Sequence, residues 1–332
     1  MQRENFSTSP YNFLCSLHML TRRHIRIKVM QTLYAFNSAE SDDLKKDEKF
    51  LLQSLESMYD LYLVILSLFI EIQKKAEDRL EKTQKKFLAT EEDKNPNYKF
   101  TNNKVLTLLK EDKALQNELE RRKLNFWYLE FEYVDIIFKA ILESSIYKDY
   151  MLTKSSDFNE DKNFLIDIFS EVIAPNEKLY DCFEDKKLTW IDDLPIVNTS
   201  VLKLLKKIKP SVHNNYFIPQ LYKDLEDRDF AIDLLKKTIL NRSKFGEEIS
   251  AKTTNWDADR IASLDSVMLH MALCELQKFP SIPVKVTINE YLEIAKEYST
   301  PKSSIFINGI LDKTIKEYSE HGKYPKTGRG LL

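Results

Sequence analysis

Residues 281–313 read SIPVKVTINEYLEIAKEYSTPKSSIFINGILDK, and they combine two helix-start signals with apolar side chains at helical spacing. Thr287 lies three residues before Glu290, which predicts a capping box, where each side chain accepts a hydrogen bond from the backbone N–H of the other residue. Thr300 is followed by Pro301, and proline suits the first position of a helix because its missing N–H has no helical partner there. We therefore expect two consecutive helices in this stretch.

The second of these helices, expected over about 301–320, contains a local contradiction. Asn308-Gly309 is a strong hairpin-turn signal, yet Ile305 and Ile310 belong to an apolar pattern that keeps helical spacing on both sides. A glycine inside a helix costs ~1 kcal/mol relative to alanine. We expect the helix to continue, with another helix backbone close to the glycine.

Further helices are expected on both sides of residues 40–220. IASLDSVMLHMALCEL lies within 257–278 and FAIDLLKKTIL within 224–240. TRRHIRIKVMQTLYAF (21–36) predicts an amphipathic helix with Thr21 as its N-cap. The first turns of this helix carry four basic residues, which are Arg22, Arg23, His24 and Arg26. Because a helix N-terminus already has partial positive charge and favours acids, these residues are either solvated or placed to bind an anion.

The middle of the chain is also predicted to be helical. Two long helices are expected over about 44–150, separated by a loop at 91–103 that contains Asn95-Pro96. The apolar run 61–70 is too short to span a bilayer, which takes ~20 residues, and is expected to lie in the core. The aromatic-rich stretch 125–142 is expected to be core as well. Shorter helices are expected near 158–173, 176–188 and 197–208, before a boundary at about 210–219.

Composition excludes several classes of protein. The chain has 332 residues and a formal net charge of −2, so any affinity for nucleic acid must come from a local patch. It has five glycines, arranged in neither a dinucleotide-binding fingerprint nor a P-loop. Its three cysteines and five histidines show no metal-binding spacing, so we expect no metal site. The missing glycine patterns predict no nucleotide cofactor, and the sequence shows no catalytic constellation. The widely separated cysteines and the absence of a secretion signal favour a cytoplasmic protein.

Three segments carry a resemblance to a known family. RRHIRIKVMQTLYAF, IASLDSVMLHMALCEL and the block at 281–313 resemble the two ends and the central helix of NusB, the bacterial transcription antitermination factors. The resemblance covers residues 21–36 and about 224–320, near one third of the chain. It implies an all-α protein of two helical bundles that binds the boxA element of ribosomal RNA leader transcripts, pairs with the ribosomal protein NusE and joins the transcription elongation complex.

The resemblance also implies roles for particular residues. Arg22, Arg23 and Arg26 fall on the family's arginine-rich segment, with His24 where the family often has another basic residue. Phe306 matches the aromatic residue of a KFVNG-like motif at the RNA-facing surface, and Lys302 lies one turn before it. The predicted RNA-binding residues are therefore Arg22, Arg23, His24, Arg26, Lys302 and Phe306. The alternatives are a core position for Phe306 and plain solvation for the cations.

Tyr34 and Asp265 correspond to NusE-contacting positions in the family. Asp265 is expected as an exposed acid facing a basic protein, and Tyr34 could equally be a core residue. The oligomeric state, monomer or homodimer, stays open, because relatives of both kinds occur.

The chain departs from the family in length. We expect a disordered leader at 1–20, an N-terminal helical domain at 21–215 enlarged by an expansion at about 40–190, a C-terminal bundle at 216–322 and a disordered tail at 323–332. Translation could start at Met1 or at Met19. Two alternative functions remain: a helical scaffold that keeps the fold without binding RNA, and a ribosomal RNA cytosine methyltransferase, which would need a downstream cofactor domain.

Overall fold

The computed structural model describes residues 18–38, 43–87, 90–213, 215–253, 262–320, 326, 327 and 330. Throughout these ranges the regular secondary structure is helical and no strand occurs, which confirms the predicted all-α class. The chain divides into two compact units. Unit 1 combines residues 1–55 with 221–332, and unit 2 comprises residues 56–220. No helix in the described ranges is both long enough and apolar enough to cross a bilayer.

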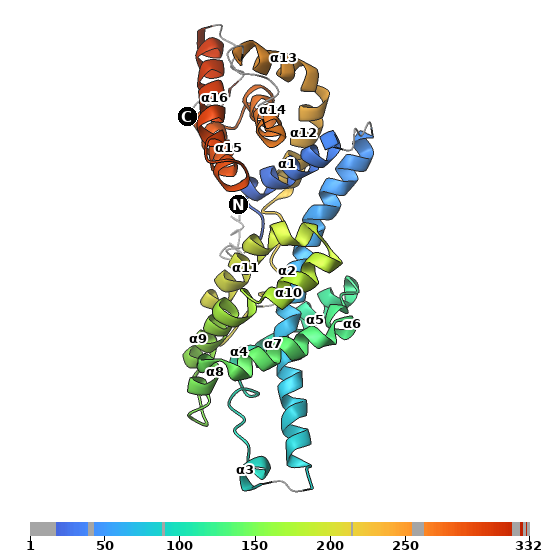
Figure 1. Ribbon diagram of the computed structural model, residues 1–332, viewed down its shortest axis with the longest axis vertical. Helices are drawn as coiled ribbons and strands as arrows, with labels where there is room; N and C mark the ends of the chain where they lie inside the picture. Colours follow the sequence, from blue (N-terminus) through green and yellow to red (C-terminus); the bar gives the residue numbers. More distant parts are fainter. Residues whose placement is uncertain are drawn as a thin grey trace, which may run out of the picture. The chain divides into compact units, whose positions relative to one another are not determined.

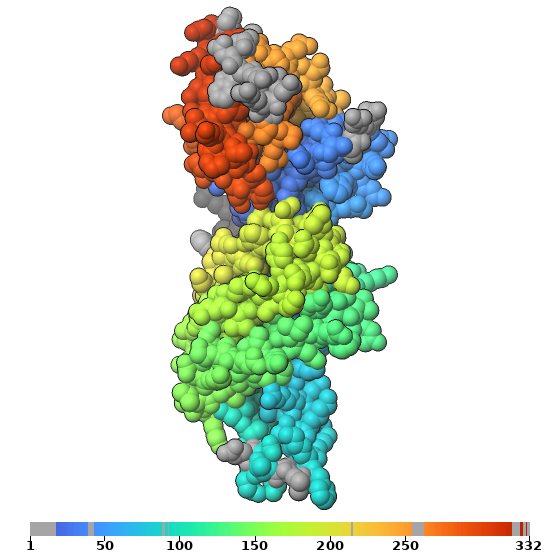
Figure 2. All heavy atoms as spheres, viewed as in Figure 1, coloured from blue at the N-terminus to red at the C-terminus, as the bar shows by residue number. Residues whose placement is uncertain are grey.

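Unit 1 is built around one central helix, against which five others pack (Figure 1). The central helix is α14 (Ser263–Lys278), which is buried along most of its length from Val267 to Leu276. The helices packed on it are α1 (Arg22–Ser38), α12 (Leu225–Leu240), α13 (Arg242–Lys252), α15 (Val284–Tyr298) and α16 (Ser303–Glu320). The atoms of α15 and α16 form a continuous part of the unit's surface, drawn in red in Figure 2.

The start of α15 differs from the sequence-based expectation. The helix begins at Val284, so Thr287 lies inside it and the predicted capping box is wrong. The Thr287 hydroxyl instead donates to the buried Glu275 carboxylate, with 2.8 Å between Thr287 Oγ1 and Glu275 Oε1. The backbone of Pro283 occupies the N-cap position. A buried acceptor on the preceding helix, 12 residues earlier, therefore decides the role of this threonine.

The helix containing Asn308-Gly309 is continuous, as predicted, and runs as α16 from Ser303 to Glu320. The reason expected for the glycine is wrong, because an added Cβ at Gly309 would meet no atom within 4 Å. The helix begins two residues after Pro301, and Thr300 Oγ1 lies 2.8 Å from Ser303 Oγ. Nothing in the structure explains the glycine.

A few described residues within the predicted leader and tail contact unit 1. At the end of the predicted leader, Leu20 is fully buried and its N–H donates to the Leu221 carbonyl at 3.0 Å. In the predicted disordered tail, Lys326 is buried and its ammonium donates to the carbonyls of Glu275 and Phe279 at the C-terminus of α14. The other residues of the leader and the tail lie outside the described ranges.

Unit 2 begins inside the longest helix and continues through a series of shorter ones. The long helix is α2 (Leu44–Gln84), in which residues 61–70 are buried as predicted. The predicted second long helix is wrong, because residues 104–150 are divided among five helices. The shorter helices of unit 2 are α3 (Glu91–Lys94), α4 (Lys104–Glu111), α5 (Lys113–Arg121), α6 (Phe126–Leu129), α7 (Phe131–Glu143), α8 (Ser145–Tyr150), α9 (Phe158–Ile168), the π-helical turn η1 (Phe169–Ile173), α10 (Glu177–Lys186) and α11 (Thr189–Lys207).

The aromatic stretch 125–142 is only partly core. Trp127 is buried and its Nε1–H donates to the Val64 carbonyl at 2.9 Å. Tyr128 and Phe131, however, are 82% and 59% exposed. The break between α6 and α7 explains this difference, because it ends the single helical periodicity on which the core prediction depended.

The division into units differs from the expected domain boundaries. The helix at 22–38 packs with α12, α14 and α15 in unit 1, whereas the sequence grouped it with the expansion. The inserted unit, residues 56–220, is thus flanked on both sides in the sequence by segments of unit 1.

Candidate nucleic-acid interface at the start of α1

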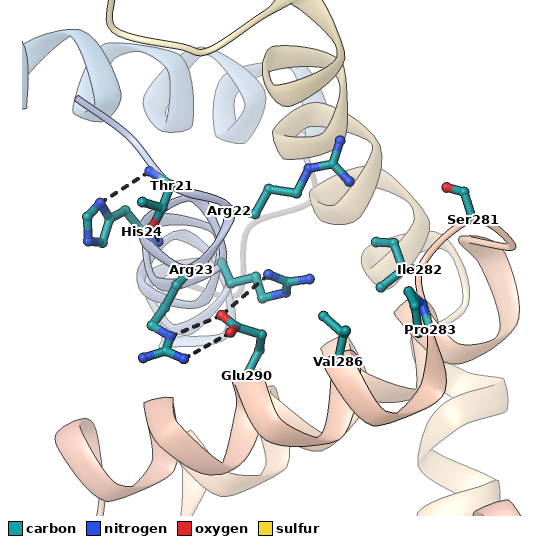
Figure 3. Close-up of a pocket in the computed structure, with 10 residues that line it drawn as sticks. Thr21, Arg22, Arg23, His24, Ser281, Ile282, Pro283, Val286 and Glu290 are labelled. Carbon is teal, nitrogen blue, oxygen red and sulfur yellow. Dashed lines mark hydrogen bonds and ion pairs between the residues drawn. The ribbon is translucent and has the colours of Figure 1, made fainter. Parts of the chain in front are cut away.

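The first turn of α1 is fixed by reciprocal hydrogen bonds. The Thr21 N–H donates to His24 Nδ1 at 3.3 Å, and Thr21 Oγ1 accepts from the His24 N–H at 3.4 Å (Figure 3). This is the capping-box arrangement with histidine in the place of glutamate. Because α1 packs on α12, α14 and α15, its basic side chains meet residues from all three helices.

Arg26 is almost fully buried, which leaves little of its side chain open to the predicted RNA contact, although it is among the residues that line the pocket at the start of α1. Its side chain is 2% exposed, and it forms a bidentate ion pair with Glu275 of α14, with Nε–Oε2 at 2.8 Å and Nη2–Oε1 at 2.7 Å. Burial acts to lower the pKa of Arg26, but the Glu275 carboxylate outweighs burial and holds the pKa above its ordinary value. The sequence could not indicate this burial. An arginine next to an apolar residue occurs in exposed helical turns as well as in buried ones.

Glu275 is a fully buried carboxylate that three helices share. Besides Arg26, it accepts hydrogen bonds from Thr287 Oγ1 at 2.8 Å and from the Tyr291 hydroxyl at 3.3 Å, both on α15. Burial raises the pKa of Tyr291, which keeps this hydroxyl a donor. Such a charge can be buried only because it is paired and hydrogen-bonded.

Arg22 and Arg23 are paired with carboxylates but remain partly exposed. The Arg23 guanidinium forms a bidentate pair with Glu290 of α15, with Nε–Oε2 at 3.0 Å and Nη2–Oε1 at 2.9 Å (Figure 3). This hydrogen bonding raises the pKa of Arg23. Arg22 Nε lies 2.9 Å from Asp227 Oδ1 on α12, and its guanidinium lies 5.1 Å from the centre of the Phe230 ring. The side chains of Arg22 and Arg23 are 38% and 39% exposed.

These contacts answer why a helix begins with basic residues. The main partners of the three arginines lie on three different helices, so the basic start joins α1 to α12, α14 and α15. Glu290 is shared, because its carboxylate also lies 3.6 Å from Nη1 of Arg26. A guanidinium has five N–H donors in a fixed planar arrangement. The pair with Glu290 uses two donors of Arg23, and the others can reach a second anion.

A pocket of about 650 Å³ opens beside these arginines. One wall is the first turn of α1, and the opposite wall is apolar, formed by Ile282, Pro283 and Val286 (Figure 3). Glu290 is the acid in its lining. The pocket thus places guanidinium N–H donors opposite an apolar surface, an arrangement suited to a ligand with a phosphate and a flat, uncharged ring.

The other predicted RNA-binding residues lie elsewhere in unit 1. Lys302 is exposed just before α16, and Phe306 is partly exposed within it. Neither lines the pocket, whereas His24 does. Residues that sequence reasoning did not assign to the site are Glu290, Asp227 and the wall at 282–286. Glu290 was noticed only as a helix cap, and no sequence signal links Asp227 to Arg22.

The two predicted NusE-facing residues differ in exposure. Tyr34 of α1 is 43% exposed. Asp265 is only 5% exposed and accepts a hydrogen bond from the Ser299 hydroxyl at 2.6 Å. The expectation of an exposed acid at Asp265 is therefore wrong, because this residue ties the first turn of α14 to the end of α15.

Fold and site together define an all-α protein whose terminal segments form one bundle with a cationic pocket. A sequence model of the NusB family matches residues 199–316. The transcription antitermination protein NusB of Salinibacter ruber is 42% identical over 112 residues, which are 34% of this chain and 70% of that protein. This chain belongs to the NusB family.

Two further relatives match a smaller share of their own length. The NusB protein of Chloroherpeton thalassium is 39% identical over 33% of this chain and 52% of the relative. The NusB protein of Geotalea uraniireducens is 42% identical over 25% of this chain and 58% of the relative. No solved structure matches the chain.

Proposed function

We propose that this protein is a transcription antitermination factor that binds single-stranded, boxA-like leader RNA and pairs with NusE in the elongation complex that transcribes ribosomal RNA. The observation that carries the proposal is its membership of a family whose relatives are named as antitermination proteins. The pocket at the start of α1 supplies a physical basis, because two partly exposed guanidiniums line it.

The proposed RNA contact requires a phosphate to share a guanidinium with a carboxylate. Glu290 orients the Arg23 side chain through two hydrogen bonds, so little side-chain entropy remains to be lost when RNA binds. A phosphate can then accept from the outer N–H groups of Arg23 and Arg22, while a base or ribose lies on the apolar wall. The backbone N–H groups of the first turn of α1 add positive potential.

The carboxylates that pair with the arginines of α1 also support a second candidate function, that of a helical scaffold. If the arginines serve only to join helices, the protein is a helical scaffold that does not bind RNA. The specific observation in favour of this alternative is that Arg22, Arg23 and Arg26 all have acidic partners within the bundle.

Two variants, one on each side of the Arg23–Glu290 ion pair, separate the candidates; Glu290 also lies 3.6 Å from Arg26. Arg23→Ala removes a phosphate donor, whereas Glu290→Gln keeps the side-chain shape but removes the competing charge. For an RNA-binding pocket, filter binding of a boxA-like RNA at low salt shows weaker affinity for Arg23→Ala and stronger affinity for Glu290→Gln. For a scaffold, neither variant changes RNA retention, although both lower the free energy of unfolding. Equal retention by wild type and both variants would reject the pocket.

The NusE contact is tested independently at Tyr34. Its ring is partly exposed on α1 and does not line the pocket. We expect Tyr34→Ala to weaken binding of purified NusE at least several-fold in calorimetry, because aromatic anchors carry much of the energy of an interface. RNA affinity measured without NusE should stay unchanged. Unaltered NusE binding would remove Tyr34 from the proposed interface.

A further inference from the structure

Unit 2 contains a basic segment, none of whose residues lines the pocket at the start of α1. Residues 194–220 include no aspartate and no glutamate, although the whole chain has 52 acidic residues among 332. The segment holds four lysines, which are Lys203, Lys206, Lys207 and Lys209. All four are exposed. None of them forms an ion pair or a side-chain hydrogen bond with the residues that the structure describes.

Helical geometry gathers three of these lysines on one face, and Lys209 follows just after the helix ends. Lys203, Lys206 and Lys207 are related by the i, i+3 and i+4 spacing that puts side chains on the same side of a helix. The opposite side of this helix end is buried, at Val201, Leu204, Leu205 and Ile208. Atoms of residues around 190–210, drawn lime to yellow, are visible on the face shown in Figure 2. At a rise of 1.5 Å per residue, the helical part of this face, from Lys203 to Lys207, is ~6 Å long.

The segment that follows holds this helix end in place. The Tyr216 hydroxyl donates to the Leu204 carbonyl at 2.8 Å, and the Tyr62 hydroxyl of α2 donates to the Phe217 carbonyl at 3.1 Å. The lysines therefore project from a fixed backbone, which reduces the entropy lost when their side chains bind a ligand.

Helix electrostatics explain only part of the pattern. Lys206 and Lys207 lie in the last turn of α11, where cations are favoured by the helix dipole. The dipole accounts for neither Lys203, a turn earlier, nor Lys209, beyond the helix. It also gives no reason for the lack of acids over the whole of 194–220.

The side chains exposed on this face indicate which class of ligand it can bind. No large hydrophobic side chain is exposed within the described part of 194–220. Protein interfaces depend on buried aromatic or aliphatic anchors, and helices that lie on membranes insert apolar side chains. A face of lysines without such anchors suits a ligand bound by charge alone. The phosphodiester backbone of a nucleic acid is such a ligand, and lysine contacts it as a point charge without reading bases.

We propose that Lys203, Lys206, Lys207 and Lys209 form a second RNA contact, which holds the phosphate backbone irrespective of sequence. The proposal rests on the proposed function, in which the chain binds single-stranded RNA. The pocket at α1 would provide selectivity, and the lysine face would add sequence-independent affinity. At ~3.4 Å per phosphate along a stacked strand, its length suits two or three phosphates.

The test uses the full chain with all four lysines changed to glutamine, which removes the charge and keeps a similar helix propensity. The matched control changes Lys74, Lys85, Lys139 and Lys178 to glutamine. These lysines are exposed, lie in the same unit and are paired with acids. Both variants change the net charge equally. The measurement is the affinity for a long uridine homopolymer at several salt concentrations.

Each single-strand phosphate contact contributes about −0.7 to the slope of log affinity against log salt. We expect the slope of the α11 variant to be about 1.4 to 2.1 less steep than that of wild type, as two or three lost phosphate contacts require. The control variant should keep the wild-type slope, and so should a variant with four arginines at the α11 positions. An unchanged slope for the glutamine variant would overturn the proposal even if it melts at a lower temperature, because the slope counts contacts and not folded molecules.

The outcomes distinguish this proposal from the proposed function. Selective boxA binding with an unchanged uridine slope keeps the function and rejects the lysine face. A reduced slope without any preference for boxA-like RNA keeps the lysine face and rejects the function. Retention of the wild type by phosphatidylserine vesicles but not by RNA would reject the lysine face in favour of a membrane surface.

Discussion

A single carboxylate organises the interior of unit 1. Glu275 is fully buried and contacts Arg26 of α1 together with Thr287 and Tyr291 of α15. The arginine side chain is equally buried, so both charges have lost their water. Removing one partner of such a pair leaves an uncompensated charge in a low-dielectric interior, and the cost exceeds the net value of the pair itself.

We therefore predict strong coupling between Arg26 and Glu275. Arg26→Met should lower the free energy of unfolding by about 3–5 kcal/mol. The double variant Arg26→Met with Glu275→Gln should lose less than the sum of the two single variants, because no buried charge remains and the glutamine still accepts from Thr287. Urea denaturation of the four proteins gives the coupling energy. Additive losses would show that the pair is solvated.

The buried cysteines predict a difference in thiol reactivity. Cys182 and Cys274 are free and buried, and burial raises the pKa of each thiol to about 12. Because the thiolate is the nucleophile, iodoacetamide at pH 8 should leave both unmodified in the folded protein and alkylate both in urea. Peptide mapping by mass spectrometry assigns the sites separately from Cys15. Rapid labelling of Cys274 in the native state would contradict its position in the core.

At the scale of elements, a network of charges joins α5 to α2 within unit 2. Arg122, directly after α5, bonds to Glu118 on α5 and to Glu56 and Asp60 on α2, each at 2.7 Å. Hydrogen bonds from Arg121 and Arg122 lower the pKa of Glu118 to about 2. The folded state thus binds a proton at this carboxylate less readily than the unfolded chain does.

This pKa difference predicts a pH window. Because the folded pKa lies below the ordinary value of 4.5, the stabilisation is fully present above pH 4.5 and is lost as the pH falls toward 2. Glu118→Gln should lower the free energy of unfolding by roughly 1–2 kcal/mol at pH 7, allowing for solvent screening of this partly exposed group. The deficit should shrink between pH 4.5 and pH 2. A deficit independent of pH would exclude the ion pair as its cause.

Gly309 predicts a gain in stability. It lies inside α16 at an exposed position, and an added Cβ would touch nothing within 4 Å. Gly309→Ala should therefore raise the free energy of unfolding by about 1 kcal/mol, the difference in helix propensity. Thermal denaturation checks the change. Loss of stability would show that the glycine has a contact outside this chain or a strained backbone.

Most helices could be predicted from apolar spacing, and the failures have local physical causes. The single pattern at 104–150 missed the helix breaks around Glu130 and Ser144, because the apolar residues continue through them. The helix α13 was missed because its apolar residues are few, with Phe245 and Ile249 buried. The basic start of α1 was visible in the sequence, but its acidic partners lie about 205 to 267 residues away. Only the fold brings them together.

At the scale of the whole molecule, the chain has two compact units with separate cores. Two of the three tryptophans, Trp127 and Trp190, are buried in unit 2. Their indole N–H groups donate to the α2 residues Val64 and Ser57, each at 2.9 Å to the carbonyl. The described part of unit 1 contains no tryptophan, so fluorescence can report on unit 2 alone once Trp256 is replaced.

We predict that the units unfold in separable steps. In the Trp256→Phe protein, urea denaturation followed by tryptophan fluorescence should give a midpoint different from that followed by far-ultraviolet circular dichroism, which reports on both units. The Arg26→Met change should shift the unit 1 step and leave the fluorescence midpoint in place. Coincident curves for both probes would mean that the units unfold together as one cooperative system.

The shared carboxylate at Glu275 has a consequence for how this sequence can diverge. A substitution there deprives an arginine, a threonine and a tyrosine of their acceptor at once. Lineages can alter the cluster only through compensated exchanges at several codons, while the exposed lysines of α11 can be gained or lost singly. We therefore expect the residues around Glu275 to change more slowly among related proteins than the exposed lysines of α11, which can vary with the ligand that each protein binds.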